Sequence, residues 1–245
     1  MKKNCVCLIC HKPNDIWLEF LSTFTKYDIY IVIDDNVKDY KKHYEKYTNI
    51  NIIQVQNEEC IKKGFMNTCY ITIRKNVTGW SKALYYFSEI NTEYDQVWFF
   101  EDDVFFYNEE SLTNIDSKYM KSDLLSRYYA ENMNGDKTDW NWKKIDIKFS
   151  PPYYGAMICA IRSSKCLLSK IKDYANKYKT LFFSEALFPT ICKHYNLQYD
   201  IPNELINIEY RRDYKDTDID KTNLYHPVKN MPTHKRYRDM LNNNK

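Results

Sequence analysis

Glycine is scarce in this chain, at 4 of 245 residues. The sequence contains neither a Gly-x-Gly-x-x-Gly turn nor a glycine-rich loop ending in Gly-Lys-Ser/Thr. Those motifs let backbone N–H groups approach phosphates closely, the first in dinucleotide-binding enzymes and the second in P-loop proteins. Their absence argues against both classes.

Long hydrophobic runs are also missing, because no stretch reaches the roughly 18 apolar residues that a membrane-spanning helix needs. The first residues are basic and lead into a short strand-like stretch, which does not fit a signal peptide. The 8 cysteines are scattered through apolar segments, as expected of reduced, buried thiols inside a cell. We therefore expect a cytoplasmic protein without a membrane span.

Neither sign of charge is in large excess, since 36 basic and 33 acidic residues leave a net charge of +3. Broad nucleic-acid binding needs a basic surface, so we expect no nucleic-acid partner. Aromatic residues are abundant instead, with 23 Tyr and 12 Phe. An AT-rich genome favours the codons of Tyr, Phe, Asn, Lys and Ile together, and this alone explains most of the bias. We therefore draw no function from it, and expect the source to be a giant virus or an AT-rich microbe. If the source is a virus, we expect the protein in the host cytoplasm.

Strand and helix signals alternate over the first part of the chain. The β-rich apolar runs lie at residues 6–10, 28–33, 51–55 and 96–100. Between them, Asn14 is placed to cap one helix, and Thr78 or Ser81 is placed to cap another. This order predicts an α/β fold with a Rossmann-type, mostly parallel sheet flanked by helices on both faces. A length of 245 residues fits a single domain.

The later part of the sequence is less regular. We expect a helix over residues 117–132, a strand over 156–161, and helices over 163–178 and 184–195. From Asp213 onward the chain is strongly charged and polar, which predicts either a mobile flap or a frayed end. No internal repeat and no linker divides the sequence.

The clearest chemical signal is the acidic cluster Glu101-Asp102-Asp103 at the end of an apolar strand. Adjacent carboxylates repel one another and are costly beside a core unless a cation neutralises them. A hard divalent ion such as Mn²⁺ or Mg²⁺ binds carboxylate oxygens and commonly bridges to substrate phosphates. Because ligands of open α/β sheets lie at the carboxyl ends of strands, the cluster predicts a metal–diphosphate site. The alternative is a solvated strand end whose acids pair with Lys or Arg.

A second acidic strand end, Asp34-Asp35, follows the run at 28–33. In a parallel sheet it lies on the same edge as the first cluster, where a nucleotide can span both. Asp34 or Asp35 would then accept a hydrogen bond from a ribose hydroxyl or a base N–H. Asp103 would bind the metal, and Glu101 would assist. Local turn chemistry explains the Asp34-Asp35 pair equally well.

The segment Val97–Val104, VWFFEDDV, resembles the metal-binding "DxD" strand of nucleotide-sugar glycosyltransferases with the GT-A fold. It is most similar to the Leu-Glu-Asp-Asp-Val form of collagen galactosyltransferases and lipopolysaccharide sugar transferases. The segment Gly79–Leu84 resembles the helix that precedes that strand. One departure is that the first motif acid, Glu101, replaces Asp. The resemblance implies a GT-A-like domain with a nucleotide-sugar-binding half at about 1–106 and an acceptor-binding half at about 107–245.

The same resemblance implies a metal-dependent glycosyltransferase with a UDP-sugar as the expected donor and a glycan, protein or lipid as acceptor. The segment Phe182–Thr190 resembles the one that carries the catalytic base in several inverting GT-A families, which makes Glu185 the candidate base. Its position is equally ordinary for a carboxylate in the first turn of a helix. If Glu185 is structural, a retaining reaction remains open.

Other site residues follow from the resemblance alone. His226 corresponds to the histidine that completes the metal shell near the carboxyl end of GT-A enzymes, and Lys229 to a basic residue that contacts the diphosphate. His234 is a rival for the histidine role. Lys82 either reaches a phosphate or caps the preceding loop. Trp140, in a polar loop, either stacks on an acceptor sugar or packs against the sheet.

Two other classes of function compete with this interpretation. A metal-dependent nuclease or phosphoesterase would use the same carboxylates to clamp a phosphodiester, although the near-neutral charge argues against a basic groove. A non-catalytic carbohydrate-binding protein would explain the aromatic residues but leaves the acidic strand end without a purpose.

Overall fold

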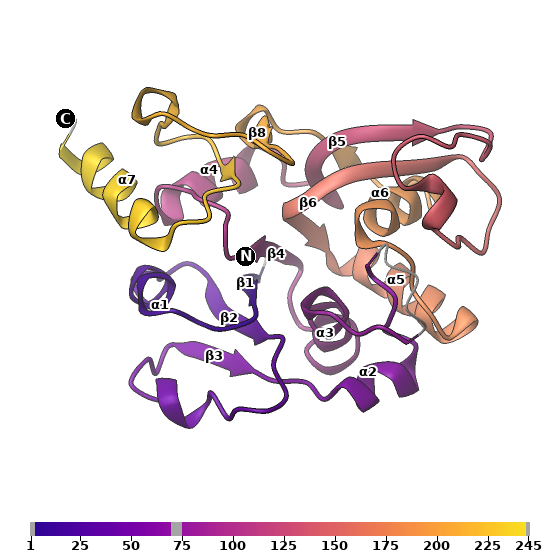
Figure 1. Cartoon of the computed structure of the whole chain (residues 1–245), viewed down its shortest axis with the longest axis horizontal. Helices are drawn as coiled ribbons and strands as arrows, with labels where there is room; N and C mark the ends of the chain where they lie inside the picture. The colour runs from indigo at the N-terminus through magenta and orange to yellow at the C-terminus, as the bar shows by residue number, and fades with distance from the viewer. Residues whose placement is uncertain (1–2, 70–74, 244–245) are drawn as a thin grey trace.

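A 7-stranded sheet runs through the middle of the protein (Figure 1). The computed structural model describes residues 3–69 and 75–243. The strands of the large sheet are β1 (Asn4–Cys10), β2 (Asp28–Ile33), β3 (Ile50–Ile53), β4 (Gln96–Glu101), β5 (Leu124–Asn132), β6 (Tyr153–Ser164) and β7 (Tyr199–Asp200). A 2-stranded sheet contains β8 (Asn207–Ile208) and β9 (Tyr225–His226).

The strand order of the large sheet is β3-β2-β1-β4-β6-β5-β7. The four adjacent strands β3, β2, β1 and β4 are parallel to one another, and the register places Cys10 beside Ile33 and Ile9 beside Glu101. β6 is antiparallel to both β4 and β5, and β7 is parallel to β5. The α/β fold with a mostly parallel sheet that we predicted from the sequence is confirmed. It forms a single mixed α/β domain.

Helices cover both faces of this sheet. They are α1 (Asp15–Leu21), α2 (Asn57–Lys63), α3 (Gly79–Tyr85), α4 (Glu109–Lys118), α5 (Lys165–Tyr178), α6 (Ser184–His194) and α7 (Met231–Asn243). Cys5 and Cys7 of β1 pack in one buried layer with residues of α2, α3, α5 and α6, whereas Val6 and Leu8 pack in a second layer with α1 and α4. In Figure 1 the first group of helices lies to the right of β4 and the second to its left. Successive side chains of β1 point to opposite faces of the sheet, so each face has its own hydrophobic core.

The expected helix caps are present. The Asn14 side chain accepts from the Trp17 N–H at 3.0 Å, and this contact begins α1. Thr78 rather than Ser81 is the N-cap of α3, and the two side chains form a reciprocal capping box. Ser164 caps α5 through the Leu167 N–H. These local signals fix where the helices start around the sheet.

The predicted helix over residues 117–132 is wrong. α4 ends at Lys118, and most of the segment forms strand β5. Leu124 and Leu125 enter opposite hydrophobic layers, as successive residues of a strand do. Pairing with β6 and β7 on its two sides therefore decides the conformation, which local propensity does not indicate.

Residues 213–243 of the charged tail form neither a free flap nor a frayed end. Phe105 exchanges both backbone hydrogen bonds with Tyr225, at 2.8 and 2.9 Å. α7 buries Tyr237 and Leu241 in a small third cluster that also contains Phe105 and Tyr225. β9 and α7 are thus held against the segment that follows β4. None of the helices in residues 3–69 and 75–243 has the length and apolar character needed to cross a membrane.

Candidate functional site

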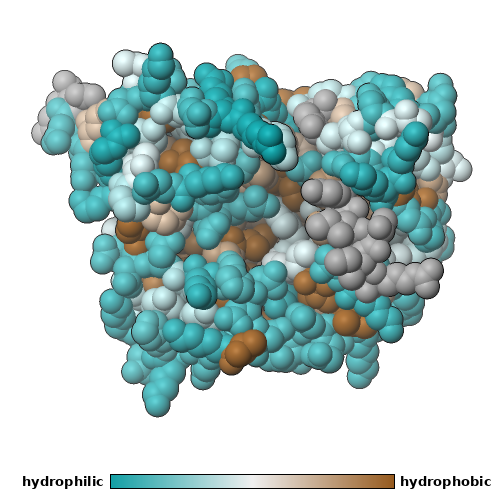
Figure 2. Space-filling model, in the orientation of Figure 1, coloured by the Kyte–Doolittle hydropathy of each residue, from teal (hydrophilic) through white to brown (hydrophobic). Residues whose placement is uncertain are grey.

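The two acidic strand ends meet at the carboxyl edge of β1, β2 and β4. They border an open cavity of about 260 Å³. Its lining residues are Ile9, Cys10, His11, Asp34, Gly79, Trp80, Glu101, Asp102 and Asp103. Figure 2 shows this face hollowed near its centre, with hydrophobic residues inside the hollow and hydrophilic ones around it. The parallel register brings the acids together, as the sequence predicted.

Asp34 is held from two sides. Its Oδ2 accepts from the Gly79 N–H at 2.9 Å, and its Oδ1 lies 2.8 Å from the Lys82 ammonium. Lys82 is 1% exposed and does not line the cavity. Its ammonium therefore contacts Asp34 from the protein interior, not from the cavity. A Cβ on Gly79 would lie 2.6 Å from Ile9 Cγ2, so only glycine allows α3 to start this close to β1. The close approach fixes the Asp34 carboxylate at the rim.

Asp35 turns away into its own loop. Its carboxylate accepts from the Val37 N–H at 2.7 Å and from the Tyr40 hydroxyl at 2.9 Å. These hydrogen bonds, the Val37 one foremost, lower the pKa of Asp35. Of the two carboxylates only Asp34 lines the cavity, together with His11, whose Nδ1 lies 3.0 Å from the Asp34 carbonyl oxygen. Sequence reasoning missed His11, although its place directly after β1 was the available signal.

The acidic cluster is anchored by two tryptophans. The Trp80 indole N–H donates to Glu101 Oε1 at 2.7 Å, and the Trp17 indole N–H donates to the Asp102 backbone oxygen at 2.8 Å. Burial raises the pKa of Asp102, and the charge of Asp103 adds to this effect. The cluster is therefore held at fixed positions while its charges still repel, which favours binding of a cation.

His226 comes to the cluster from the far end of the chain. The pairing of Phe105 with Tyr225 continues as a hydrogen bond from the Val228 N–H to the Asp103 carbonyl oxygen at 2.7 Å. As a result, His226 Nε2 lies 3.3 Å from Asp103 Oδ1. Burial lowers the pKa of His226, but Asp103, together with the Glu209 carbonyl and the charge of Glu101, outweighs this, so the pKa is raised overall.

The tautomer of His226 suits metal binding. Its Nδ1 lies 2.5 Å from the Glu209 carbonyl oxygen, which can only accept, so Nδ1 carries a proton. Nε2 can therefore present its lone pair toward the acidic cluster in the neutral ring. A carbonyl that orients the far nitrogen is the arrangement usual for metal-binding histidines.

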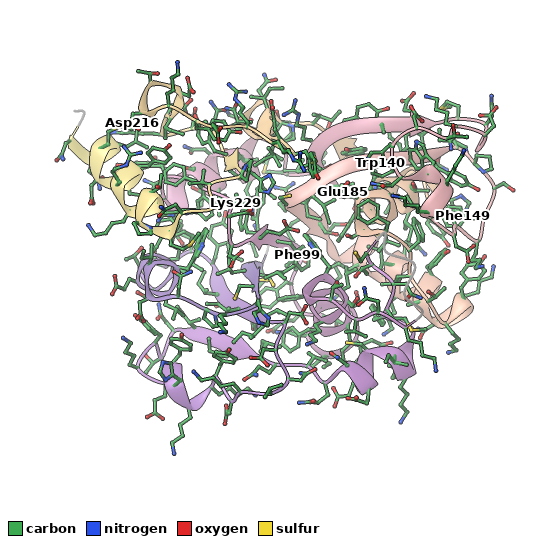
Figure 3. All side chains as sticks on the ribbon, in the orientation of Figure 1. Phe99, Trp140, Phe149, Glu185, Asp216 and Lys229 are labelled. Atoms are coloured by element: carbon green, nitrogen blue, oxygen red, sulfur yellow. The ribbon has the colours of Figure 1, made fainter. Side chains whose placement is uncertain are left out.

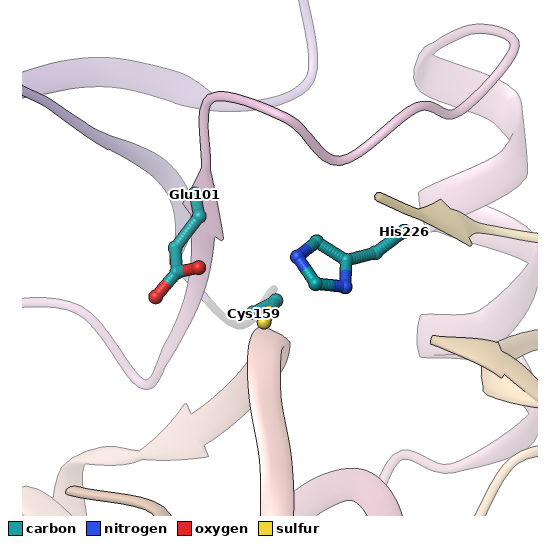
Figure 4. Close-up of side chains that lie close together, drawn as sticks. All are labelled: Glu101, Cys159 and His226. Carbon is teal, nitrogen blue, oxygen red and sulfur yellow. The ribbon is translucent and has the colours of Figure 1, made fainter. Parts of the chain in front are cut away.

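Cys159 of β6 joins these residues and was missed by sequence reasoning. Ligand atoms of Glu101, Cys159 and His226 all lie within 4.8 Å of one another (Figure 4). The antiparallel register pairs Phe100 with Ala160, so the next step along both strands places Glu101 beside Cys159. No pattern in the sequence alone could have supplied that pairing.

Glu185 lies in the first turn of α6, beside a second cavity of about 310 Å³. Trp140, Phe183 and Tyr210 contribute aromatic rings to the same cavity. The pKa of Glu185 is raised to about 7, mainly by burial and also by the charge of Glu101, with His226 acting in the opposite direction. Glu185 is thus close enough to Glu101 and His226 for their charges to act on it.

The two remaining candidates differ in their surroundings. His234 is completely buried, and its ring packs edge-on against Trp17, so it belongs to the core beneath α7 rather than to the acidic cluster. Lys229 is exposed on the segment between β9 and α7. Figure 3 shows Lys229 and Glu185 above Phe99 of β4 in this view.

Solved structures resemble this arrangement in fold. No protein-family model matches the chain, and no curated protein matches it either. The galactosyltransferase LgtC, in complex with donor and acceptor sugar analogues, is 10% identical, with a TM-score of 0.50 over 97% of this chain and 96% of that chain. The chain has a GT-A-like fold. At this identity the similarity establishes the fold alone.

Two further solved structures have lower TM-scores. Mouse xyloside xylosyltransferase 1 is 11% identical, with a TM-score of 0.42 over 82% of this chain and 85% of that chain. The 4-diphosphocytidyl-2C-methyl-D-erythritol synthase of Anaerococcus prevotii is 12% identical, with a TM-score of 0.46 over 82% and 88%.

Proposed function

We propose that the chain is a metal-dependent glycosyltransferase that moves a sugar from a nucleoside-diphosphate sugar, expected to be a UDP-sugar, to an acceptor hydroxyl. The acceptor is a glycan, a protein or a lipid. One observation carries the proposal: His226, from the end of the chain, lies 3.3 Å from Asp103 at the carboxyl edge of a GT-A-like sheet. A purely structural ion pair would not need an open cavity lined by four carboxylates beside it.

The residues at this edge fit a hard divalent ion, Mn²⁺ or Mg²⁺. Asp103 and Glu101 offer carboxylate oxygens, and His226 offers Nε2 with its lone pair directed by the Glu209 carbonyl. The bound ion supplies positive charge that neutralises the departing diphosphate.

The residues of the chain then divide the binding of the donor. We propose that Asp34, which lines the cavity, accepts from the ribose or the base, whereas Asp35 maintains the turn. Lys82 acts through Asp34, because it is buried and its ammonium is 2.8 Å from that carboxylate. Lys229 is exposed just after His226 and can contact the diphosphate as a point charge.

We propose Glu185 as the general base of an inverting reaction. A carboxylate with a pKa of about 7 removes a proton from an acceptor hydroxyl more effectively than an ordinary one near neutral pH. The aromatic lining of its cavity, from Trp140, Phe183 and Tyr210, suits the apolar face of a sugar. A glycan is therefore the acceptor class that this cavity favours.

Thermal melting tests the donor site. UDP, GDP, CMP and several UDP-sugars are compared, each with and without Mn²⁺. A ligand at one hundred times its Kd stabilises the folded state by about 2.7 kcal/mol, which is about 5–10 °C for a domain of this size. We expect this shift for one nucleotide only with the metal, and its loss in Asp103→Asn.

Asp136→Asn serves as the matched control, because it removes an exposed carboxylate outside the site. It should keep the metal-dependent shift. If no nucleotide shifts the midpoint, with or without Mn²⁺, the transferase proposal fails and a nuclease assay becomes the next measurement.

A further inference from the structure

Glu101, Cys159 and His226 form a set of three different ligand types. Their ligand atoms lie within 4.8 Å of one another, and Figure 4 shows the three side chains grouped around one space. A tetrahedral zinc site needs neighbouring ligand atoms about 3.4–3.7 Å apart, given metal–ligand distances of about 2.0–2.3 Å. Small side-chain rotations would therefore close the set around one ion.

Asp103 is not a member of this set. It lies against the same Nε2 of His226, but its carboxylate is not within the common 4.8 Å limit. His226 Nε2 is thus close both to the Asp103 carboxylate and to the group that contains the Cys159 thiol. The two groups differ in chemical softness, because a thiolate prefers zinc-like ions and carboxylates prefer Mg²⁺ or Mn²⁺.

We propose that Glu101, Cys159 and His226 bind a thiophilic divalent ion, Zn²⁺ in particular, in competition with the hard ion held by Asp103, Glu101 and His226. Zn²⁺ takes the place of the thiol proton, and the fourth ligand is water or a phosphate oxygen. Because both ions use His226 Nε2, only one can bind at a time. Zinc would therefore exclude the catalytic ion and inhibit the enzyme.

The surroundings of the cluster favour this ligand set. Cys159 is 6% exposed and His226 is equally enclosed, so few water molecules compete for the ion. The Trp80 indole N–H holds one oxygen of Glu101, and the Glu209 carbonyl holds the far nitrogen of His226. In zinc proteins, hydrogen-bond partners of this kind orient the side chains that bind the metal. The inference rests on the proposed function for the position of the catalytic ion, but its test needs no sugar nucleotide.

Cobalt(II) provides the measurement, since a thiolate bound to Co²⁺ gives a sulfur-to-metal charge-transfer band in the near ultraviolet. The full chain is titrated with Co²⁺, and Zn²⁺ is then added to displace it. We expect the band in the unaltered chain and in Cys166→Ser, which removes an exposed thiol outside the cluster. Cys159→Ser should lack it.

Affinity provides a second measure. Loss of an outer-shell partner alone costs about 10–100-fold in metal affinity, so Cys159→Ser should weaken Zn²⁺ binding by no less than about tenfold. Mn²⁺ binding should change far less, because Asp103 remains. His226→Gln should lose the cobalt band with Cys159 intact, which guards against a Cys159 variant that does not fold.

A cobalt band that persists in Cys159→Ser, or that disappears in Cys166→Ser, overturns the inference. So does the absence of any such band in the unaltered chain. Each of these results can occur while UDP still binds with Mn²⁺, so the failure of this inference is distinguishable from the failure of the proposed function.

Discussion

Acidification should destabilise this protein through His234, a fully buried histidine of α7. Its ring is 0% exposed, and its Nε2 lies 2.7 Å from the Val228 carbonyl oxygen, so Nε2 carries the proton. Nδ1 has no hydrogen-bond partner among the described residues. A second proton there would place an unpaired charge in the core. Burial, with the nearby Arg238, lowers the pKa of His234 to about 4.

The sign follows from comparing the folded and unfolded states. Unfolded histidine titrates near 6.5, so between pH 6.5 and about 4 the unfolded chain binds more protons, and the free energy of unfolding decreases as the pH falls. Each pKa unit corresponds to about 1.4 kcal/mol, which gives a loss of about 2 kcal/mol between about pH 7.5 and about pH 5. Most of the carboxylates remain ionised in that window.

Denaturant unfolding at these two pH values measures the effect. His234→Gln keeps an amide N–H for the Val228 carbonyl but cannot be charged, so the unaltered chain should lose about 2 kcal/mol more than the variant. His226 has a raised pKa and acts in the opposite direction, but it is common to both proteins and cancels in the difference. His43→Gln, at an exposed histidine, should behave like the unaltered chain.

Equal losses in the unaltered chain and in His234→Gln would refute this reasoning. Protonation of His234 should also affect the acidic cluster. The Val228 carbonyl contacts His234, and the Val228 N–H donates to the Asp103 carbonyl oxygen. Release of α7 would loosen the segment that holds His226. Metal-dependent nucleotide binding should therefore weaken over the same pH range.

Three further predictions follow from single contacts. Glu185→Gln should lower kcat of sugar transfer by about 10²–10⁴-fold, as expected for a lost general base, while UDP binding with Mn²⁺ measured by melting stays unchanged; an unaltered kcat would contradict the role. Arg162→Met leaves Asp116, whose side chain is only 13% exposed, without the guanidinium that lies 2.6 Å away, so it should cost about 3–5 kcal/mol in denaturant unfolding. Adding Asp116→Asn should recover part of that loss. Gly79→Ala forces a Cβ to within 2.6 Å of Ile9 and should cost about 1–3 kcal/mol, and no loss would mean that α3 can shift.

Local chemistry in the sequence determined the parallel half of the fold. The buried strands β1, β2 and β4 are continuous apolar runs, and Asn14 and Thr78 mark helix starts by their side-chain oxygens. Because these signals act over a few residues, they can be recognised without knowledge of the rest of the chain. The acidic strand end was visible for the same reason, since parallel strands place their carboxyl ends on one edge.

Signals that depend on distant partners could not be recognised in this way. Leu124–Asn132 is a strand because β6 and β7 lie beside it, and the polar tail is ordered because Phe105 pairs with Tyr225. Tertiary contacts also decided which of the two histidines lies at the acidic cluster. His226 reaches Asp103 through that pairing, whereas His234 is enclosed by Trp17 and Phe105.

The sequence by itself therefore determined the parallel strands β1 to β4 and which strand end is acidic, since propensity, alternation and capping are properties of neighbouring residues. Only the tertiary structure decided which of the two aspartates after β2 lines the cavity, which histidine joins Asp103, and that Cys159 stands beside Glu101. These are contacts between residues far apart in the chain, and their energies come from strand pairing and burial, which exist only once the sheet has formed.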